Sequence, residues 1–480
     1  MHKLGLLATV GLLGLATGAA VAHEFDFGLF RDHQLQEHSR QLFGITGPIK
    51  TSSTASVDAA TAEADPTALV TLAKSLHVRV VTAATNAGAN IDQMALWPND
   101  QHATHLIVCN EEDATKPGVQ RVRLSDGLVE TMLTGTVSCD PVRRTAWGTI
   151  MVGEEVSPTT TPSTPGGWLL EIIDPLHTTN VQFDRVTGVL SGTDAGNVAT
   201  RPAPGRLAFE GLALYPNGVI YYGDENRPSQ GTPGGAYFKF IPTTPWTDGD
   251  PITNLNQSPL GEGKVYGLRL AKRLTGNPPT PTDYGQGSNT GLGTWVEVVN
   301  ANNADLRAAA ASLKLTGYYR PEDADIDGRA LAQGQVRFCA NNTGNEGTDH
   351  QWGETICMTD GSLAEATANT ATPEVQYFII GTPDFAMMDN IAYQPGRGNW
   401  IVHEDGDGPE VGRNNDLWSC LEDGADADSL SDGCVRIGTL NDLNAEWTGG
   451  IFDASGTHFY VSVQHNVTGH GVILEVTGWR

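Results

Sequence analysis

The segment Phe209–Asn226, "FEGLALYPNGVIYYGDEN", contains two short apolar runs, a turn between them and acidic residues at both ends. Pro216-Asn217-Gly218 is a typical turn sequence, and the flanking runs are rich in β-branched and aromatic residues. Two such runs joined by a short turn with glycine predict a β-hairpin. Glu210 stands at the start of the first strand, so the hairpin carries a carboxylate at its open end.

The same order of acidic residue, short strand, turn and second strand recurs along the chain. It is found in Ile91–Glu111, Glu322–Phe338, Met388–Asp405 and Thr448–Ser462. Little helical pattern separates these units; the clearest helix candidate is Asn303–Leu315, where a polar cap precedes an alanine-rich run. Recurrent hairpins over most of a chain predict sheets repeated around an axis. We therefore expect an all-β fold, a β-propeller with long insertions between strands, such as 157–167 and 275–293.

The acidic residues of these hairpins predict a metal centre. In a propeller the innermost strand of each blade starts near one end of the central axis, so residues at equivalent positions converge there. Glu210, Glu322 and Asp389 occupy such positions, and Asp92 is a looser match. Clustered carboxylates repel one another unless a cation lies between them, and oxygen ligands suit Ca²⁺. The alternative is that each acid caps a turn or forms a local salt bridge.

Charge and the N-terminus indicate where the protein works. The chain has 480 residues and a formal net charge of −27, which excludes nucleic acid and anionic membrane surfaces as partners by repulsion. Lys3, the apolar run Leu4–Ala19 and the small residues before His23 predict a secretory signal peptide, residues 1–22, cleaved after Ala22. No later run approaches the roughly 20 apolar residues of a membrane span. We expect a secreted or periplasmic monomer with a partly loose segment, 23–84, and a single propeller domain, 85–480.

The six cysteines leave one question open. Cys339 and Cys357, and likewise Cys420 and Cys434, are close enough in sequence to form local disulfides. Cys109 and Cys139 remain; they could pair with each other, or one could supply a thiolate metal ligand, because connectivity does not follow from sequence alone.

Several segments together resemble the PhoX-type alkaline phosphatases. They are "TAWGTIMVGEE" (Thr145–Glu155), the opening hairpin, "YYRPEDADID" (Tyr318–Asp327), "FAMMDNIAYQPGRGNWIVHEDGDG" (Phe385–Gly408) and "FYVSVQHN" (Phe459–Asn466). They follow the family's order through most of residues 85–475. The resemblance implies a six-bladed propeller, a secreted enzyme that hydrolyses phosphomonoesters, and an axial site that holds calcium and iron ions, Ca²⁺ and Fe³⁺.

The resemblance also implies roles for individual residues. Arg320 and Glu322 would be catalytic, and Arg320 and Asn390 would bind the substrate phosphate. The implied metal ligands are Cys139, Glu154, Glu210, Glu322, Asp389 and Glu111. The chain departs from the family pattern in three places: the twin-arginine export signal is missing, the stretch from Cys139 to Trp147 is one residue longer, and "QHN" replaces "QHP". Two other functions stay open, a calcium-dependent lactonase or esterase and a non-catalytic calcium-binding propeller.

Overall fold

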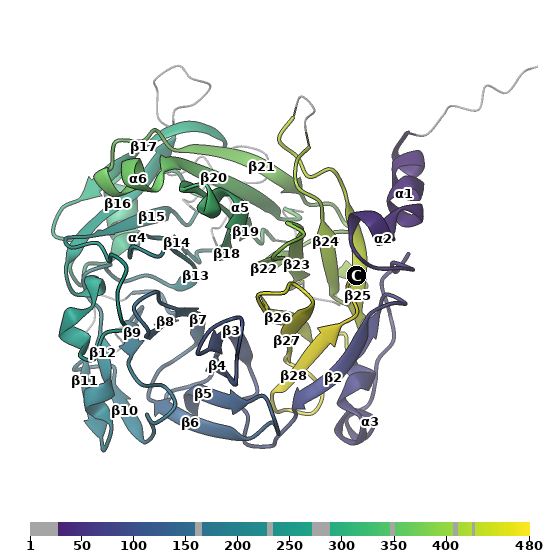
Figure 1. Cartoon of the computed structure of the whole chain (residues 1–480), viewed down its shortest axis with the longest axis horizontal. Helices are drawn as coiled ribbons and strands as arrows, with labels where there is room; N and C mark the ends of the chain where they lie inside the picture. Colours follow the sequence, from purple (N-terminus) through teal and green to yellow (C-terminus); the bar gives the residue numbers. More distant parts are fainter. Residues whose placement is uncertain are drawn as a thin grey trace, which may run out of the picture.

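The strands of this computed structural model are arranged as blades around a central axis (Figure 1). The structure describes residues 27–158, 166–227, 234–270, 289–345, 351–406, 411–424 and 428–480. The predicted signal peptide, residues 159–165 of the first predicted insertion and residues 275–288 of the second lie outside these residues. Among the described helices, none has the length and apolarity that a membrane crossing requires.

In the first three blades the strands run outward from the axis in chain order, and they pair antiparallel except for β10, which pairs with β6 in parallel. Blade 1 consists of β3 (Ile91–Trp97), β4 (His105–Asn110), β5 (Pro117–Arg123) and β6 (Val129–Thr134), extended by β10 (Val181–Asp184) and β11 (Val189–Gly192). Blade 2 consists of β7 (Cys139–Arg144), β8 (Ile150–Glu154), β9 (Leu169–Ile172) and β12 (Val198–Thr200). Blade 3 consists of β13 (Phe209–Leu214), β14 (Ile220–Asp224), β15 (Tyr237–Pro242), β16 (Gly263–Leu270) and β17 (Gly291–Val298).

The other three blades complete the ring. Blade 4 consists of β18 (Pro321–Ile326), β19 (Gln335–Asn342), β20 (Glu354–Ser362) and β21 (Glu374–Ile380), and β21 pairs with β17 of blade 3. Blade 5 consists of β22 (Met388–Tyr393), β23 (Trp400–Glu404), β24 (Asp416–Cys420), β25 (Cys434–Leu440) and β1 (Val70–Leu72). Blade 6 consists of β26 (Glu446–Phe452), β27 (His458–Gln464), β28 (Val472–Thr477) and β2 (His77–Thr82). Neighbouring innermost strands touch all the way round, from β3 through β7, β13, β18 and β22 to β26 and back to β3, which confirms the six-bladed propeller.

The start of the chain closes the ring. β1 pairs with β25 and β2 pairs with β28, so residues from the N-terminal segment form the outermost strands of the last two blades. The described α-helices are short and lie outside the blades: α1 (Phe27–Glu37), α2 (Ser39–Leu42), α3 (Ala59–Ala64), α4 (Leu306–Leu313), α5 (Gly328–Ala332) and α6 (Leu363–Ala368). The 3₁₀ turns are η1 (Pro66–Leu69), η2 (Ala195–Asn197), η3 (Leu255–Gln257) and η4 (Pro259–Gly261). α4 confirms the predicted helix, and Asp305 caps it by accepting a hydrogen bond from the Ala308 N–H.

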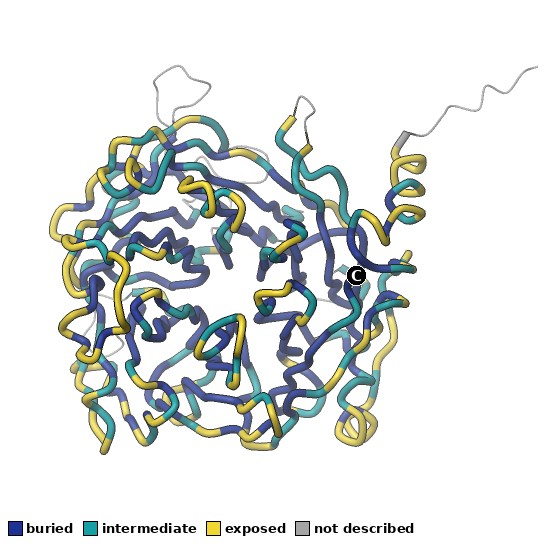
Figure 2. The backbone as a smooth tube through the Cα atoms, in the orientation of Figure 1, coloured by how far each residue is buried: buried dark blue, intermediate teal, exposed yellow. Residues whose placement is uncertain are grey.

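The core lies between the blades. Trp147, Trp400 and Trp447 are fully buried in three different blade contacts. Figure 2 shows that buried residues follow the strands, whereas exposed residues concentrate in turns and loops, both at the periphery and around the axis. Removing this apolar surface from water is the main favourable term in folding.

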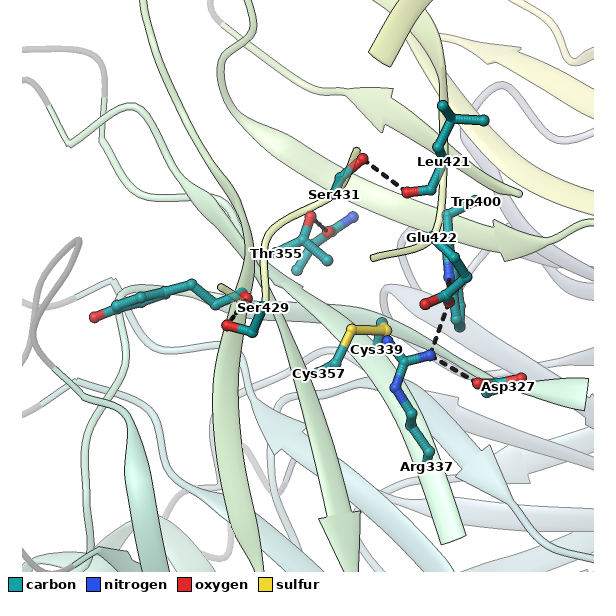
Figure 3. The surroundings of a disulfide bond; sticks show 12 residues. Asp327, Arg337, Cys339, Thr355, Cys357, Trp400, Leu421, Glu422, Ser429 and Ser431 are labelled. Atoms are coloured by element: carbon teal, nitrogen blue, oxygen red, sulfur yellow. Dashed lines mark hydrogen bonds and ion pairs between the residues drawn. A yellow bond between two sulfur atoms is a disulfide. The ribbon is translucent and has the colours of Figure 1, made fainter. Parts of the chain in front are cut away.

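Three disulfides link the described strands. Cys339–Cys357 joins β19 to β20 and Cys420–Cys434 joins β24 to β25, which confirms both predicted local pairs. Figure 3 shows the first of these beside Arg337, whose guanidinium pairs with Asp327 and Glu422. The third disulfide, Cys109–Cys139, joins β4 of blade 1 to β7 of blade 2 and decides the alternative that the sequence left open.

Candidate metal centre

A β-bulge at the start of five innermost strands turns an acidic side chain toward the axis. In β3, β7, β13, β18 and β22 the ladder is interrupted after the first residue, so that two residues oppose one on the second strand. The first of the two bulged residues is acidic in each case, and a bulge re-aims the side chain that it releases from the regular pleat. These residues are Asp92, Asp140, Glu210, Glu322 and Asp389. In blade 6 the first residue of β26, Glu446, supplies the sixth acid.

The second strand of most blades adds a further polar group at the same end of the axis. The strand ends on a buried polar residue, and the next residue lies near the axis. These pairs are Asn110-Glu111, Glu154-Glu155, Asp224-Glu225, Glu404-Asp405 and Gln464-His465. Where the buried member is charged, an arginine pairs with it: Arg185 with Glu154, Arg307 with Asp224 and Arg413 with Glu404.

The carboxylates form one continuous group, which we call the axial acid cluster. Nine acids contribute oxygen atoms to four overlapping triads, and within each triad these atoms lie within 4.8 Å of one another. The triads are Asp92–Glu111–Asp140, Asp140–Glu155–Glu210, Glu210–Glu322–Asp389 and Asp389–Asp405–Glu446. The structure thus brings the predicted residues Glu210, Glu322 and Asp389 together, and it places Glu111 with Asp92.

The electrostatics of the cluster favour a bound cation. Burial is the main cause that raises the pKa of Glu210 and of Asp140 well above the ordinary range. Repulsion by Asp140 raises the pKa of Glu210 further, and repulsion by Glu111 does the same for Asp140. Burial raises the pKa of Glu322 to about 7, although Arg320 acts in the opposite direction. Both carboxylate oxygens of Asp140, Oε2 of Glu210 and Oδ1 of Asp389 accept no hydrogen bond from any residue that the structure describes. Buried carboxylate oxygens without hydrogen-bond partners are suitable ligands for a hard cation.

Arg320 lies at the rim of the cluster. Its Nε is 2.8 Å from Glu225 Oε1, its Nη2 is 3.0 Å from Glu322 Oε1, and Nη2 is 3.8 Å from Asp405 Oδ2. The backbone of Arg320 has a φ of 58°, in the left-handed region, although it precedes a proline, where extended backbone is preferred. The backbone of Arg320 is therefore strained, and its guanidinium is paired with three carboxylates of the site, Glu322 among them.

Asn390 is fully buried beside the cluster. Its Nδ2 donates to Asp92 Oδ1 at 3.2 Å, and its Oδ1 accepts from the Gly449 N–H at 3.1 Å. The amide therefore connects blade 5 to blades 1 and 6, and it lies behind the acids, away from the rim.

Two predicted ligands are not in the cluster. The prediction that Cys139 is a metal ligand is wrong, because its sulfur is bonded to Cys109 and its side chain lies in the apolar core between blades 1 and 2. Glu154 is fully buried in an ion pair with Arg185, 2.6 Å between Nε and Oε1. Successive strand side chains point in opposite directions, and the structure accordingly places Glu155, not Glu154, in the cluster.

Sequence reasoning missed four acids of the cluster: Asp140, Glu155, Asp405 and Glu446. A signal for them was present. Aligning the repeats on the residue after each second strand selects Glu111, Glu155 and Asp405 together. Aligning them on the start of each first strand adds Asp140 and Glu446.

Comparisons with known proteins agree with this geometry. The family model described as "Alkaline phosphatase PhoX" matches residues 117–466, more than half of the chain. Among solved structures, Pseudomonas fluorescens PhoX in complex with vanadate, a transition state analogue, has a TM-score of 0.59 at 14% identity, covering 90% of this chain and 98% of that chain. No curated protein sequence matches the chain.

Other solved structures are more distant. The PQQ-bound aldose sugar dehydrogenase of Streptomyces coelicolor has a TM-score of 0.40 at 13% identity, covering 85% of this chain and 99% of that chain. A Trichoderma reesei enzyme of carbohydrate-active family AA12 has a TM-score of 0.37 at 11% identity, covering 90% of this chain and 100% of that chain. These scores are too low to support an inference. The family match, together with the fold and the acidic axis, shows that the chain belongs to the PhoX alkaline phosphatase family.

Proposed function

We propose that this protein is a secreted, calcium-dependent phosphatase that hydrolyses phosphomonoesters at the axial acid cluster. The observation that carries the proposal is the juxtaposition of overlapping carboxylate triads with Arg320, whose guanidinium reaches the Glu210–Glu322–Asp389 triad through Glu322. Membership of the PhoX family supports the reaction class. The similarly folded Pseudomonas fluorescens PhoX was captured with vanadate, a transition state analogue, which supports phosphate chemistry at this fold.

The ligand set determines which cations fit. All donors of the four triads are carboxylate oxygens, and Ca²⁺ takes six to eight oxygen ligands in flexible geometry. A thiolate-ligated iron does not fit, because the one cysteine that the family pattern would assign to it is in a disulfide. We therefore propose Ca²⁺ and assign no iron to this centre.

The side chains of the site have distinct tasks in the proposed reaction. Arg320 presents a planar fork of N–H donors that matches two phosphate oxygens, and Glu225 fixes this fork by its contact with Nε. Glu210, Glu322 and Asp389 would hold the cation nearest to Arg320. The substrate phosphate would then contact a positive charge on two sides, the cation and the guanidinium. Bound cations would neutralise phosphate oxygens and lower the pKa of a water molecule for attack on phosphorus. Arg320 would stabilise the charge that develops on the phosphoryl oxygens.

Export is supported by two features. The N-terminal sequence has the pattern of a signal peptide, and the described chain contains three disulfides. Disulfides persist in oxidising compartments and are rare in the cytosol.

The test is hydrolysis of p-nitrophenyl phosphate by the purified mature protein from neutral to alkaline pH, with added Ca²⁺ and in parallel with EDTA. We expect turnover that requires Ca²⁺. Replacing Glu322 by Gln keeps the shape of the side chain and removes its charge, so both calcium content and turnover should fall sharply. The matched control is Asp126→Asn. Asp126 is an exposed acid in a turn, where it pairs with Arg123 and accepts from the Leu128 N–H, so its replacement should leave both unchanged.

Other outcomes would favour the alternatives. Opening of lactones without turnover of any phosphate ester would indicate a lactonase, in which Arg320 is dispensable. Folded protein that retains calcium and turns over no ester would indicate a binding propeller.

A further inference from the structure

Arg143, on β7, has every guanidinium N–H engaged at the axis. Nε donates to Leu212 O at 2.9 Å. Nη1 donates to Gln93 Oε1 at 2.5 Å and to Val142 O at 2.9 Å. Nη2 donates to Asp323 Oδ1 at 2.7 Å and to Ala324 O at 2.9 Å. A guanidinium has five N–H groups, so this side chain has no donor left for a ligand.

These bonds connect the innermost strands of different blades. Through Leu212, Gln93 and Asp323, Arg143 binds β13, β3 and β18 from its own strand, β7. Oδ2 of Asp323 accepts from the Ile391 N–H of β22 at 3.2 Å. The side-chain amide of Asn390, also on β22, extends this network to β26, because its Oδ1 accepts from the Gly449 N–H. A hydrogen-bonded layer centred on Arg143 thus crosses the axis and involves all six blades.

The layer lies directly behind the axial acid cluster. Gln93, Asp323 and Asn390 are the second residues of their bulges, and each follows an acid of the cluster in sequence. Burial lowers the pKa of Arg143, but the neighbouring carboxylates of Asp323, Asp325 and Asp140 raise this pKa above its ordinary value. Any shift of Arg143 would move the backbone segments that carry three of the acids.

A cavity of about 250 Å³ lies on the opposite side of the layer. Its walls are the later residues of the same innermost strands, including Leu96, Leu214, Ile326 and Ile451, with Arg143 at its inner end. None of the nine acids of the cluster lines it. Arg143 and its partners therefore separate the cavity from the acids.

We propose that Arg143 is a positioning residue that locks the acid-bearing strands in register and closes the axis behind the metal centre. This inference rests on the proposed metal centre and goes beyond the reaction itself. Metal ions then exchange only through the mouth at which Arg320 lies. The closure is made by a permanently charged side chain with all its donors satisfied, so it holds over the whole working pH range.

The experiment compares Arg143→Ala with the wild type and with a matched control, Arg144→Ala. Arg144 lines the same cavity, but it binds Asp100 and the Leu96 carbonyl, at the far side of the layer. Each protein is loaded with Ca²⁺ and desalted, and its metal content is measured by mass spectrometry. The rate of Ca²⁺ release into an excess of fluorescent chelator is then recorded, and circular dichroism checks that each variant is folded.

We expect Arg143→Ala to release Ca²⁺ about ten- to a hundredfold faster than the wild type, the factor that corresponds to one hydrogen bond to a charged group. Arg144→Ala should release it at the wild-type rate. Added methylguanidinium, which can occupy the vacated position, should slow release from Arg143→Ala alone.

Several results would overturn the inference. A folded Arg143→Ala with wild-type content and release rate would do so, and so would equal acceleration in Arg144→Ala. If Arg143→Ala does not fold, Arg143→Lys decides: it keeps the charge with fewer donors and should give an intermediate rate, and a wild-type rate would contradict the proposal. Wild-type protein that holds Ca²⁺ without phosphatase activity would refute the proposed function and leave this comparison valid. Wild-type protein that retains no cation would overturn both.

Discussion

Replacing Glu210 by Gln should change the stability of the protein in opposite ways with and without Ca²⁺. Glu210 belongs to two triads at once and lies among carboxylates, with no cation among its strongest electrostatic neighbours. Gln keeps the volume of the side chain but carries no charge. The variant therefore removes repulsion from the metal-free protein and a ligand from the loaded one.

The magnitude follows from the geometry of the triads. Two unit charges 4.8 Å apart repel by about 3.5 kcal/mol at an effective dielectric constant of about 20. Burial raises the pKa of Glu210, and each ionised neighbour, Asp140 first, raises that pKa further. The pKa of Glu210 is therefore higher in the folded state than in the unfolded state. Protonated Glu210 contributes stability that is fully present below the unfolded pKa and is lost as the pH rises through the folded pKa.

The assay is urea unfolding of EDTA-treated protein at pH 6 and pH 9, followed by the same series with Ca²⁺. Metal-free wild type should be less stable at pH 9, and Glu210→Gln should lose less stability between the two pH values. Ca²⁺ at about a hundred times its dissociation constant should stabilise the wild type by about 2.7 kcal/mol, whereas Glu210→Gln should gain much less. Asp126→Asn serves as the control for a charge lost outside the cluster.

The reasoning would be refuted by metal-free wild type that is equally stable at both pH values. It would also be refuted if Ca²⁺ stabilised Glu210→Gln as much as the wild type.

Three further predictions concern other parts of the molecule. Replacing Cys109 and Cys139 together by Ser should lower the free energy of unfolding by about 3–4 kcal/mol, because the disulfide closes a loop with a 30-residue separation. Calcium content should stay unchanged, and a loss of calcium would support Cys139 as a metal ligand. Lys239→Met should cost about 3–5 kcal/mol in urea unfolding, because it removes the cation 2.7 Å from the buried carboxylate of Asp360 and leaves that charge with the hydrogen bonds from Tyr221 and Trp295. Adding Asp360→Asn should recover part of the loss, and additive effects would argue against the pair. Arg320→Ala should lower kcat/KM for a phosphomonoester by about a hundredfold while calcium content is retained, and unchanged kinetics would exclude Arg320 from substrate binding.

Local sequence signals were enough to predict the propeller. A strand, a Pro-Asn-Gly turn and a second strand form a unit whose structure depends on neighbouring residues, and recurrence of the unit predicts repeated sheets. The same recurrence placed Glu210, Glu322 and Asp389 at equivalent positions, and these are the residues of one triad. Position within a repeat was thus the informative signal, because the repeats are arranged about a common axis.

Which of two adjacent acids reaches that axis depends on where the second strand ends, and the tertiary structure shows this end. Glu154 and Glu155 are the same residue type and adjacent in sequence. At the end of β8 the side chain of Glu154 pairs with Arg185, whereas that of Glu155 belongs to the axial acid cluster. The partner of Cys139 also depends on how blades 1 and 2 meet. The contacts of Arg143 likewise require the ring to be closed, since its acceptors come from strands far apart in the chain. The sequence by itself determined the repeat and its acidic positions, which are local properties; bulges, blade contacts and ring closure decided the direction of each side chain, because these arise only when distant segments pack together.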